Sequence, residues 1–349
     1  MPEVASASRV RGEVRDLANA GNIIPSSRFV FEIFGGKDNM RSFLTGQSQA
    51  FAVLALLYGG VLAALVIIWV VREVPIGIRI PTDVLMFCVV GWVQYSICNG
   101  MHEAVHYNLR NRDGDFLASL LTAWPIGLTM GYRGTHLAHH RFMGTARDPD
   151  YPMYTCFPAS RLALASRLVW YVSGIPALIQ FLGLLGLRGD RLDPSIMTRT
   201  GAGLSGLAGF IAMQFFIAGL FWLVFGSPVD YVVFWCLPIA TVGKLLSSTR
   251  LLCEHGSPER DWVVRTIHAP RWRTWILGAF DFNYHGEHHL FPYVPFAGLR
   301  RVHDLHAAYL MTPHPDHPLV DRIEIYEGGY VSLLMRWFRD LPWVKEKRA

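Results

Sequence analysis

The sequence predicts an all-α integral membrane protein with four transmembrane helices and a helical cap on the cytosolic side that carries clustered histidines. Three observations predict this fold class. Only 17% of the 349 residues are charged, which is less than a soluble domain of this length usually carries. Four apolar runs are long enough to cross a hydrocarbon core, which takes about 20 residues. Eight of the fourteen histidines stand in three short groups, each just beyond an apolar segment.

The apolar runs predict the four spans in order, at about 50–71, 83–101, 203–226 and 230–249. The first two runs contain no charged residue between Phe51 and Val71 or between Val84 and Met101. The third is free of charge from Thr200 to Val229. The fourth run, from Tyr231 to Leu252, holds only Lys244 and Arg250 as charged residues. A large soluble core does not explain four such runs, so we expect each of them to span the membrane.

The distribution of basic residues predicts which side the connections face. If the N-terminus lies inside, the outer connections hold only Arg72 and Arg79, and Lys244 lies within a span. Every other Lys and Arg then lies on the inner side, as the positive-inside rule requires. We therefore expect three parts, namely an N-terminal cytosolic segment at 1–49, a membrane domain at 50–310 and a C-terminal cytosolic tail at 311–349. The first part contains no apolar core of a signal peptide, and no nucleic-acid motif is present.

Two further apolar stretches, Phe116–Met130 and Leu168–Leu187, are expected not to span. The first is too short and contains Trp124-Pro125. The second is long enough, but if it crossed alone, histidine groups on either side of it would face opposite sides of the membrane. We expect both stretches to lie in the interface, or to dip into the membrane and return.

The histidine groups have the spacing of metal ligands. They read "HEAVH" with His102 and His106, "HLAHH" with His136, His139 and His140, and "HGEHH" with His285, His288 and His289, while His255 follows the fourth span. Residues three and four apart share one face of a helix. Imidazole suits iron, zinc, copper and nickel, and a single zinc takes only three or four ligands. Eight or nine imidazoles therefore predict two metal ions with positions left open for a small molecule.

Other hypotheses explain fewer of these residues. "HEAVH" also fits a zinc protease, with His102, His106 and His136 as ligands and Glu103 as the general base. That hypothesis leaves six of the nine histidines without a role. A membrane haem protein needs paired histidines on facing helices within the bilayer, and a metal transporter needs polar ligands at mid-membrane. The apolar runs offer neither pattern.

From about residue 50 to about residue 310 the chain resembles the membrane-bound fatty acid desaturases, which share a histidine-box diiron site with membrane hydroxylases and ketolases. "HLAHHRFMGTARDPDYP" resembles the second box, "NYHGEHHLFPYVPFAGL" the third, and "RLLCEHG" the extra histidine after the last span. The first box has three residues between its histidines, as in lipid and ketolase branches, whereas many acyl-CoA members have four. The substrate could therefore be an acyl-CoA, a membrane lipid or an acyl carrier protein thioester.

The resemblance implies a set of site residues and partners. The implied iron ligands are His102, His106, His136, His139, His140, His255, His285, His288 and His289. Carboxylates and one amide beside them are expected to accept hydrogen bonds from the ring N–H groups of the ligands: Glu103, Asp148, Asp150, Glu254, Asn283 and Glu287. No catalytic residue is expected beyond the metal site. Around His303 and His306 an amphipathic surface helix is expected.

The implied reaction uses two iron ions and O2 to introduce a double bond into the alkyl chain of a fatty acyl or lipid substrate, and hydroxylation or ketone formation is the alternative. No His-Pro-Gly-Gly signature of a fused cytochrome b5 is present. The electron donor is therefore expected to be a separate protein of the ferredoxin or cytochrome b5 type with its reductase. With no organelle signal, we expect a cell inner (plasma) membrane with both termini in the cytoplasm.

Overall fold

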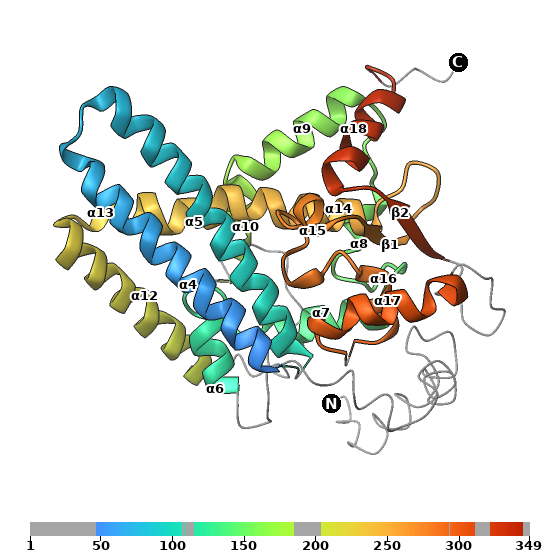
Figure 1. Cartoon of the computed structure of the whole chain (residues 1–349), viewed down its shortest axis with the longest axis horizontal. Helices are drawn as coiled ribbons and strands as arrows, with labels where there is room; N and C mark the ends of the chain where they lie inside the picture. Colours follow the sequence, from blue (N-terminus) through green and yellow to red (C-terminus); the bar gives the residue numbers. More distant parts are fainter. Residues whose placement is uncertain are drawn as a thin grey trace, which may run out of the picture.

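The computed structural model describes residues 47–106, 108, 115–184, 204–292, 294–310 and 322–344. Within these ranges the protein is mostly helical, as Figure 1 shows. The predicted N-terminal segment lies almost wholly outside the described residues. Four helical segments are long and apolar enough to cross a membrane in this part of the chain, at 49–73, 76–105, 206–225 and 228–255. This confirms the four predicted spans, with the second and fourth longer than the apolar runs alone suggested.

The first two spans form an antiparallel hairpin. Helix α4 (Gln47–Val70) ends in the 3₁₀ turn η1 (Val71–Glu73), and α5 (Ile76–Val105) returns beside it. Figure 1 shows the two helices side by side. Helix α5 begins at Ile76, directly after Pro75 and before the apolar run, and Arg79 and Asp83 pair at 3.4 Å one helical turn apart. It also continues past Met101, so His102 lies within its last turn.

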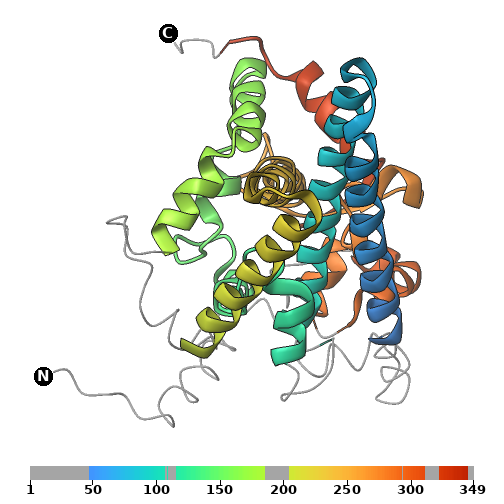
Figure 2. The same cartoon turned by 90° about the vertical axis from the view of Figure 1, so that its left-hand side faces the viewer.

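The third and fourth spans form a second hairpin. Helix α12 (Leu204–Phe225) is followed by α13 (Pro228–Tyr231), the π-helical turns η4 (Val232–Cys236) and η5 (Ile239–Gly243), and α14 (Lys244–His255). Figure 2 looks nearly along the axis of this last span. The two π turns flank Pro238, which has no amide hydrogen to donate into the helix.

The fourth span packs tightly against α5. A Cβ on Gly91 would come within 2.7 Å of both the Pro238 carbonyl oxygen and the Val242 Cβ. Only glycine permits this approach, so the backbones of the two spans touch at this point.

The outer connections of the two hairpins meet at one end of the bundle. Arg72, at the turn after α4, pairs with Asp230 in α13 at 2.7 Å, and it also donates to the Phe225 carbonyl. The histidine-bearing ends of α5 and α14 lie at the other end (Figure 1). This agrees with the predicted topology, in which the two short connections share a face. Which face of the membrane this is stays a prediction.

Neither of the two shorter apolar stretches forms a continuous helix of spanning length. The first consists of α6 (Asp115–Ala118) and the π turn η3 (Ser119–Ala123), followed by a turn. Gln214 of α12 donates to the carbonyl of Trp124, and Trp235 of the fourth span donates to Pro125. The second stretch divides into α9 (Arg161–Val172) and α10 (Ile175–Leu184) at Gly174, where φ is +77°. Their depth in the membrane stays a prediction.

The remaining elements form a cap at the histidine end of the bundle. In chain order they are α7 (Tyr132–Phe142), α8 (Tyr151–Thr155), β1 (Val264–His268), α15 (Arg271–Thr274), η6 (Ala279–Asp281), α16 (His285–Leu290), α17 (Phe296–Leu310), β2 (Ile323–Glu327) and α18 (Tyr330–Asp340).

A small sheet corrects the all-α prediction in one detail. Strands β1 and β2 pair in parallel, with Val264 opposite Ile323 and His268 opposite Glu327. Both segments are short and rich in β-branched residues, which favours strands. Their pairing places part of the predicted C-terminal tail against the histidine-bearing elements.

Candidate metal centre

Four elements bring the histidines together at one end of the spans. Helix α5 supplies His102 and, just past its end, His106, and α14 supplies His255. The cap supplies the other six from α7 and α16, namely His136, His139, His140, His285, His288 and His289. Eight of the nine are buried and His106 is partly buried. The three sequence groups and His255 therefore converge on one region, as predicted.

The first histidine group consists of five imidazoles. One ring nitrogen from each lies within 4.8 Å of one ring nitrogen from every other: His102, His106, His136, His140 and His288. Four of them form a chain of Nε2 contacts. His136 Nε2 lies 2.9 Å from the Nε2 atoms of His106 and His140, and His140 Nε2 lies 3.0 Å from that of His288. The ring of His102 packs against His136, with centroids 4.2 Å apart. All three sequence motifs contribute to this group.

The second histidine group consists of His139, His255, His285 and His289. Nitrogens of His139, His255 and His289 lie within 4.8 Å of one another. His285 joins them, because its Nε2 lies 2.8 Å from that of His255 and 2.9 Å from that of His289. The nine histidines named from the sequence thus divide between two adjacent groups.

The surroundings favour the neutral form of most of the histidines outside the spans. Burial lowers the pKa of His106 to about 3. Burial, together with the neighbouring imidazoles, also lowers the pKa of others well below the usual range: His136, His140, His285, His288 and His289. A neutral imidazole with a free lone pair is the form that binds a metal ion.

The convergent nitrogens fit two bound cations. An Nε2 atom carries either one hydrogen or one lone pair, so a crowd of such atoms at 2.8–3.0 Å cannot satisfy itself by hydrogen bonds alone. Among the described residues, neither ring nitrogen of buried His102 has a hydrogen-bond partner. A cation between the rings would accept these lone pairs. All-imidazole donor sets suit first-row transition metals.

His139 is oriented by a carboxylate. Its Nδ1 lies 3.0 Å from both oxygens of Asp148, and Tyr154 donates a hydrogen bond to the same carboxylate. Asp150 is more distant, at 3.8 Å from His139 Nδ1. Burial alone would lower the pKa of His139, but the two aspartates outweigh it and raise that pKa. With Nδ1 bonded to Asp148, Nε2 is left to face the second histidine group.

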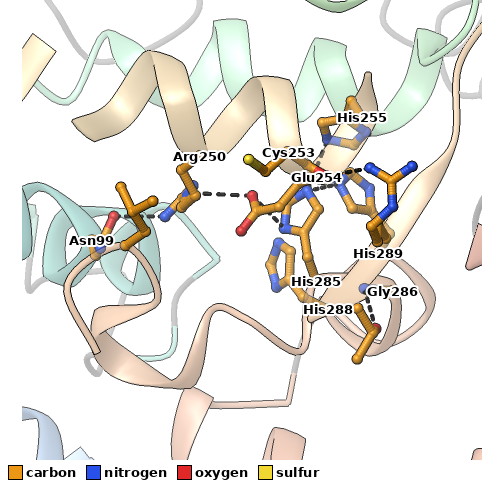
Figure 3. A network of polar contacts seen from close by, with 12 residues as sticks. Asn99, Arg250, Cys253, Glu254, His255, His285, Gly286, His288 and His289 are labelled. Atoms are coloured by element: carbon orange, nitrogen blue, oxygen red, sulfur yellow. Dashed lines mark hydrogen bonds and ion pairs between the residues drawn. The ribbon is translucent and has the colours of Figure 1, made fainter. Parts of the chain in front are cut away.

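His255 and His285 are oriented from α14 and its surroundings. His255 Nδ1 donates to the Val263 carbonyl at 3.1 Å, which leaves its Nε2 as an acceptor. Glu254 Oε2 lies 3.4 Å from His285 Nδ1 and 3.2 Å from Arg250 Nε. Figure 3 shows this line of contacts, which continues from Arg250 to Asn99 of α5.

Two of the other predicted supporting residues contact the backbone instead. Glu103 Oε2 accepts a hydrogen bond from the Phe296 amide at 3.1 Å, and so joins α5 to the start of α17. Asn283 donates to the Ile267 carbonyl, and the Ile267 amide donates to the Asn283 carbonyl. The Glu103 contact gives this carboxylate a structural role between two elements of the fold.

Sequence reasoning missed the role of His303. We expected a solvated helix around it, but His303 is buried and its Nδ1 lies 2.6 Å from Glu287 Oε1. The other oxygen of Glu287 accepts from the Thr266 hydroxyl. Glu287 lies between ligand positions in "HGEHH". A carboxylate in that place needs a hydrogen-bond partner from elsewhere in the chain, and this was the sequence signal that could have pointed to one. His306 side-chain placement lies outside what the structure describes.

Comparisons with known proteins agree with this arrangement. The family described as "Fatty acid desaturase" matches residues 81–318. A curated relative from Caenorhabditis elegans, named "Putative sphingolipid delta(4)-desaturase/C4-monooxygenase", is 25% identical over 228 residues. That alignment covers 63% of this chain and 57% of the relative, so the chain matches little more than half of the relative's length. Because the family match covers more than half of the chain, and the boxes it contains meet in space, the chain belongs to the fatty acid desaturase family.

Proposed function

We propose that this membrane oxidoreductase is a diiron, O2-dependent desaturase that introduces a double bond into the alkyl chain of a lipid or fatty acyl substrate. The observation that carries the proposal is the division of nine imidazoles into two adjacent groups at one end of four spans. The family match supports it. The zinc-protease hypothesis explains neither the family match nor the six imidazoles of the two groups that it leaves unused.

In this proposal the first histidine group holds one iron and the second group holds the other. The chemistry that a bound iron pair supplies is activation of O2, with two electrons from a donor, for removal of hydrogen from an unactivated C–H bond. The chain's own contribution is to hold neutral imidazoles in place and to exclude water. Burial contributes to both, because eight of the nine rings are almost fully enclosed, and it lowers the pKa of rings such as His136 and His288.

An apolar cavity supports an alkyl chain as the substrate. A space of about 650 Å³ lies between the α6–η3 segment and α12, lined by Phe116, Trp124, Met130, Gly209, Met213 and Phe216 among others. A volume of this size suits a lipid-sized ligand. Met130 also packs in the same buried cluster as Met101, which directly precedes His102. An alkyl chain in this space would approach the first histidine group from the membrane side.

The electron donor and the orientation belong to the same proposal. We expect a separate donor of the ferredoxin or cytochrome b5 type, which docks on the cytosolic cap. The predicted excess of basic residues on the histidine side supports placing this side and both termini in the cytoplasm, in the cell inner (plasma) membrane.

Oxygenation is the second candidate function. The name of the curated relative pairs a desaturase with a C4-monooxygenase. Both reactions begin with removal of hydrogen from a C–H bond, and they diverge in whether a second hydrogen is lost or oxygen is added. Which outcome dominates depends on which C–H bonds lie nearest the metal ions.

The test is a comparison of total lipids by mass spectrometry after expression in a host with few related lipids. Wild type is compared with His288→Ala, which removes a ring of the first group, and with His268→Ala. His268 is a matched control because it pairs with Glu327 at the surface, with its side chain 37% exposed. We expect a product two hydrogens lighter than its parent from wild type and His268→Ala, and none from His288→Ala.

Other outcomes separate the alternatives. A product heavier by one oxygen, lost in His288→Ala, would place the protein among the hydroxylases and ketolases and leave the metal assignment unchanged. Purified protein that binds one zinc ion and no iron would contradict the diiron proposal.

A further inference from the structure

We propose that Tyr330 of α18 is a positioning residue for the second histidine group, which acts on His285 by holding Glu254. The inference rests on the proposed two-metal function and deepens it. Tyr330 lies beyond residues 81–318, the range that the family match covers. If Tyr330 has this role, the C-terminal segment takes part in the metal centre.

The carboxylate of Glu254 is fully buried and divides its two oxygens between different partners. Oε1 accepts a hydrogen bond from the Tyr330 hydroxyl at 2.7 Å. Oε2 faces Arg250 Nε at 3.2 Å and His285 Nδ1 at 3.4 Å. Neither contact is a hydrogen bond, so Oε2 lies between Arg250 and His285 at ion-pair distance, and only the oxygen bonded to the tyrosine is fixed. The Tyr330 hydroxyl therefore sets the direction in which Oε2 points.

Arg250 is itself held from the opposite side. Its Nη1 donates to Asn99 Oδ1 at 2.7 Å, and its guanidinium lies over the Phe282 ring at 5.1 Å. Asn99 lies one helical turn before His102 on α5. The contacts therefore run from α5 through α14 to α18, as Figure 3 shows for Asn99, Arg250, Glu254 and His285. Glu254 is the point where this line meets a metal-ligand candidate.

The sheet and α18 place Tyr330 with little freedom. Parallel pairing of β2 with β1 continues into a hydrogen bond from the Gly328 amide to the His268 carbonyl. Helix α18 begins at Tyr330, and Leu333 and Trp337 pack in one buried cluster with Leu252 and Cys253 of α14. The hydroxyl thus reaches Glu254 from a helix that is fixed to the same span.

Removing the hydroxyl would release Glu254 toward Arg250. A carboxylate without its Oε1 partner can turn to face the guanidinium with both oxygens, which is the stronger geometry for an arginine pair. His285 Nδ1 would then lose its nearest acceptor, and the orientation of its ring would weaken. The first histidine group has no contact with Glu254 among the described residues, so it would be unaffected.

The experiment measures iron in the full-length protein in detergent, reconstituted anaerobically with ferrous iron and then dialysed against increasing chelator. We compare wild type, Tyr330→Phe and Tyr326→Phe. Tyr326 is the matched control, because it is on the neighbouring strand and its hydroxyl contacts only Ser332, at 3.3 Å and near the surface, among described residues. We expect Tyr330→Phe to lose one of its two irons at about tenfold lower chelator, while Tyr326→Phe behaves as wild type.

A double-mutant cycle separates positioning from general packing. Glu254→Gln should lower iron retention at the same site, and Tyr330→Phe should add nothing in the Glu254→Gln background. If Tyr330→Phe retains both irons as wild type does, or if the two losses add, the positioning role is overturned. If wild type itself binds no pair of irons, the proposed function fails as well, so the two failures are distinguishable.

Discussion

The two histidine groups differ in the residues that contact the Nδ1 atoms of their rings. In the second group, three of the four rings have an oxygen near Nδ1, from Asp148, Val263 and Glu254. In the first group, the described contacts give only the Tyr132 hydroxyl, at 3.4 Å from His136 Nδ1. Among the described residues, Nδ1 has no hydrogen-bond partner in His102 and His288 of the first group, nor in His285 and His289 of the second.

The two sites therefore differ in how their rings are oriented. The first group relies on the number of rings and on their packing against one another and against Phe282. The second group has fewer rings, and two of them, His139 and His255, are oriented by Nδ1 hydrogen bonds to acceptors that also make the ring more basic. We therefore expect the second site to depend on residues outside its ligands far more than the first site does.

The largest expected effect comes from two histidines that are neighbours in sequence but belong to different groups. His288 belongs to the first group and His289 to the second. We expect His288→Ala and His289→Ala each to abolish activity, and each to lower bound iron from about two per chain toward one. The remaining iron should differ between the variants, because the two sites have different ligand sets.

Mössbauer spectra of the two singly occupied proteins provide the measurement. Two distinct signals that together reproduce the wild-type spectrum are expected. Identical spectra from both variants would argue against the division into two groups.

The next effect breaks the support of the second group without touching a ligand. Asp148→Asn keeps the shape of the side chain but removes the charge that orients His139. We expect about 10- to 100-fold weaker iron binding at one site, measured by chelator competition. Asp150→Asn is the control, since Asp150 lies farther from His139, at 3.8 Å. Equal losses from the two variants would show that charge in the region, rather than contact with the ring, is what matters.

The smallest effect concerns the contact between Glu287 and His303. Glu287 belongs to α16, the helix that supplies rings to both groups. Burial alone would lower the pKa of His303, but the hydrogen bond and charge of Glu287, together with the charges of Asp304 and Glu327, raise it. A raised pKa in the folded state means that the stabilisation is full below the ordinary histidine pKa and is lost as pH rises through the raised value. We expect His303→Gln to lower the unfolding midpoint at pH 6 and to differ less from wild type at pH 9. Thermal unfolding at the two pH values measures this, and a constant difference would contradict it.

The spans and the nine histidines could be predicted from the sequence because their signals are local. Apolar run length predicts a span, and spacing of three or four residues predicts a shared helix face. The division of the histidines into two groups could not be predicted, because it depends on how α7 and α16 face each other. His139 and His140 are adjacent on α7, and each belongs to a different group.

The missed features depend on contacts between distant residues. His303 reaches Glu287 from sixteen residues away, and Tyr330 reaches Glu254 from seventy-six residues away. Nothing in their local sequence distinguishes either one from a surface residue of an amphipathic helix. The β1–β2 pair was missed for the same reason, since its strands are fifty-nine residues apart.

The two π turns of the fourth span make its length as important as its composition. Each residue of an α-helix turns the chain by about 100°, and Arg250, Glu254 and His255 all follow the turns at Val232–Cys236 and Ile239–Gly243. Losing a single residue from the α-helical stretch between the second turn and Arg250 would rotate all three away from α5 and α16 although the three side chains remained present, whereas a π turn that lost one residue could become an ordinary α turn and keep the phase. In this span, substitutions on the lipid side and deletions from the α-helical stretch differ in kind: the former change a surface, whereas the latter reset the phase of everything that follows.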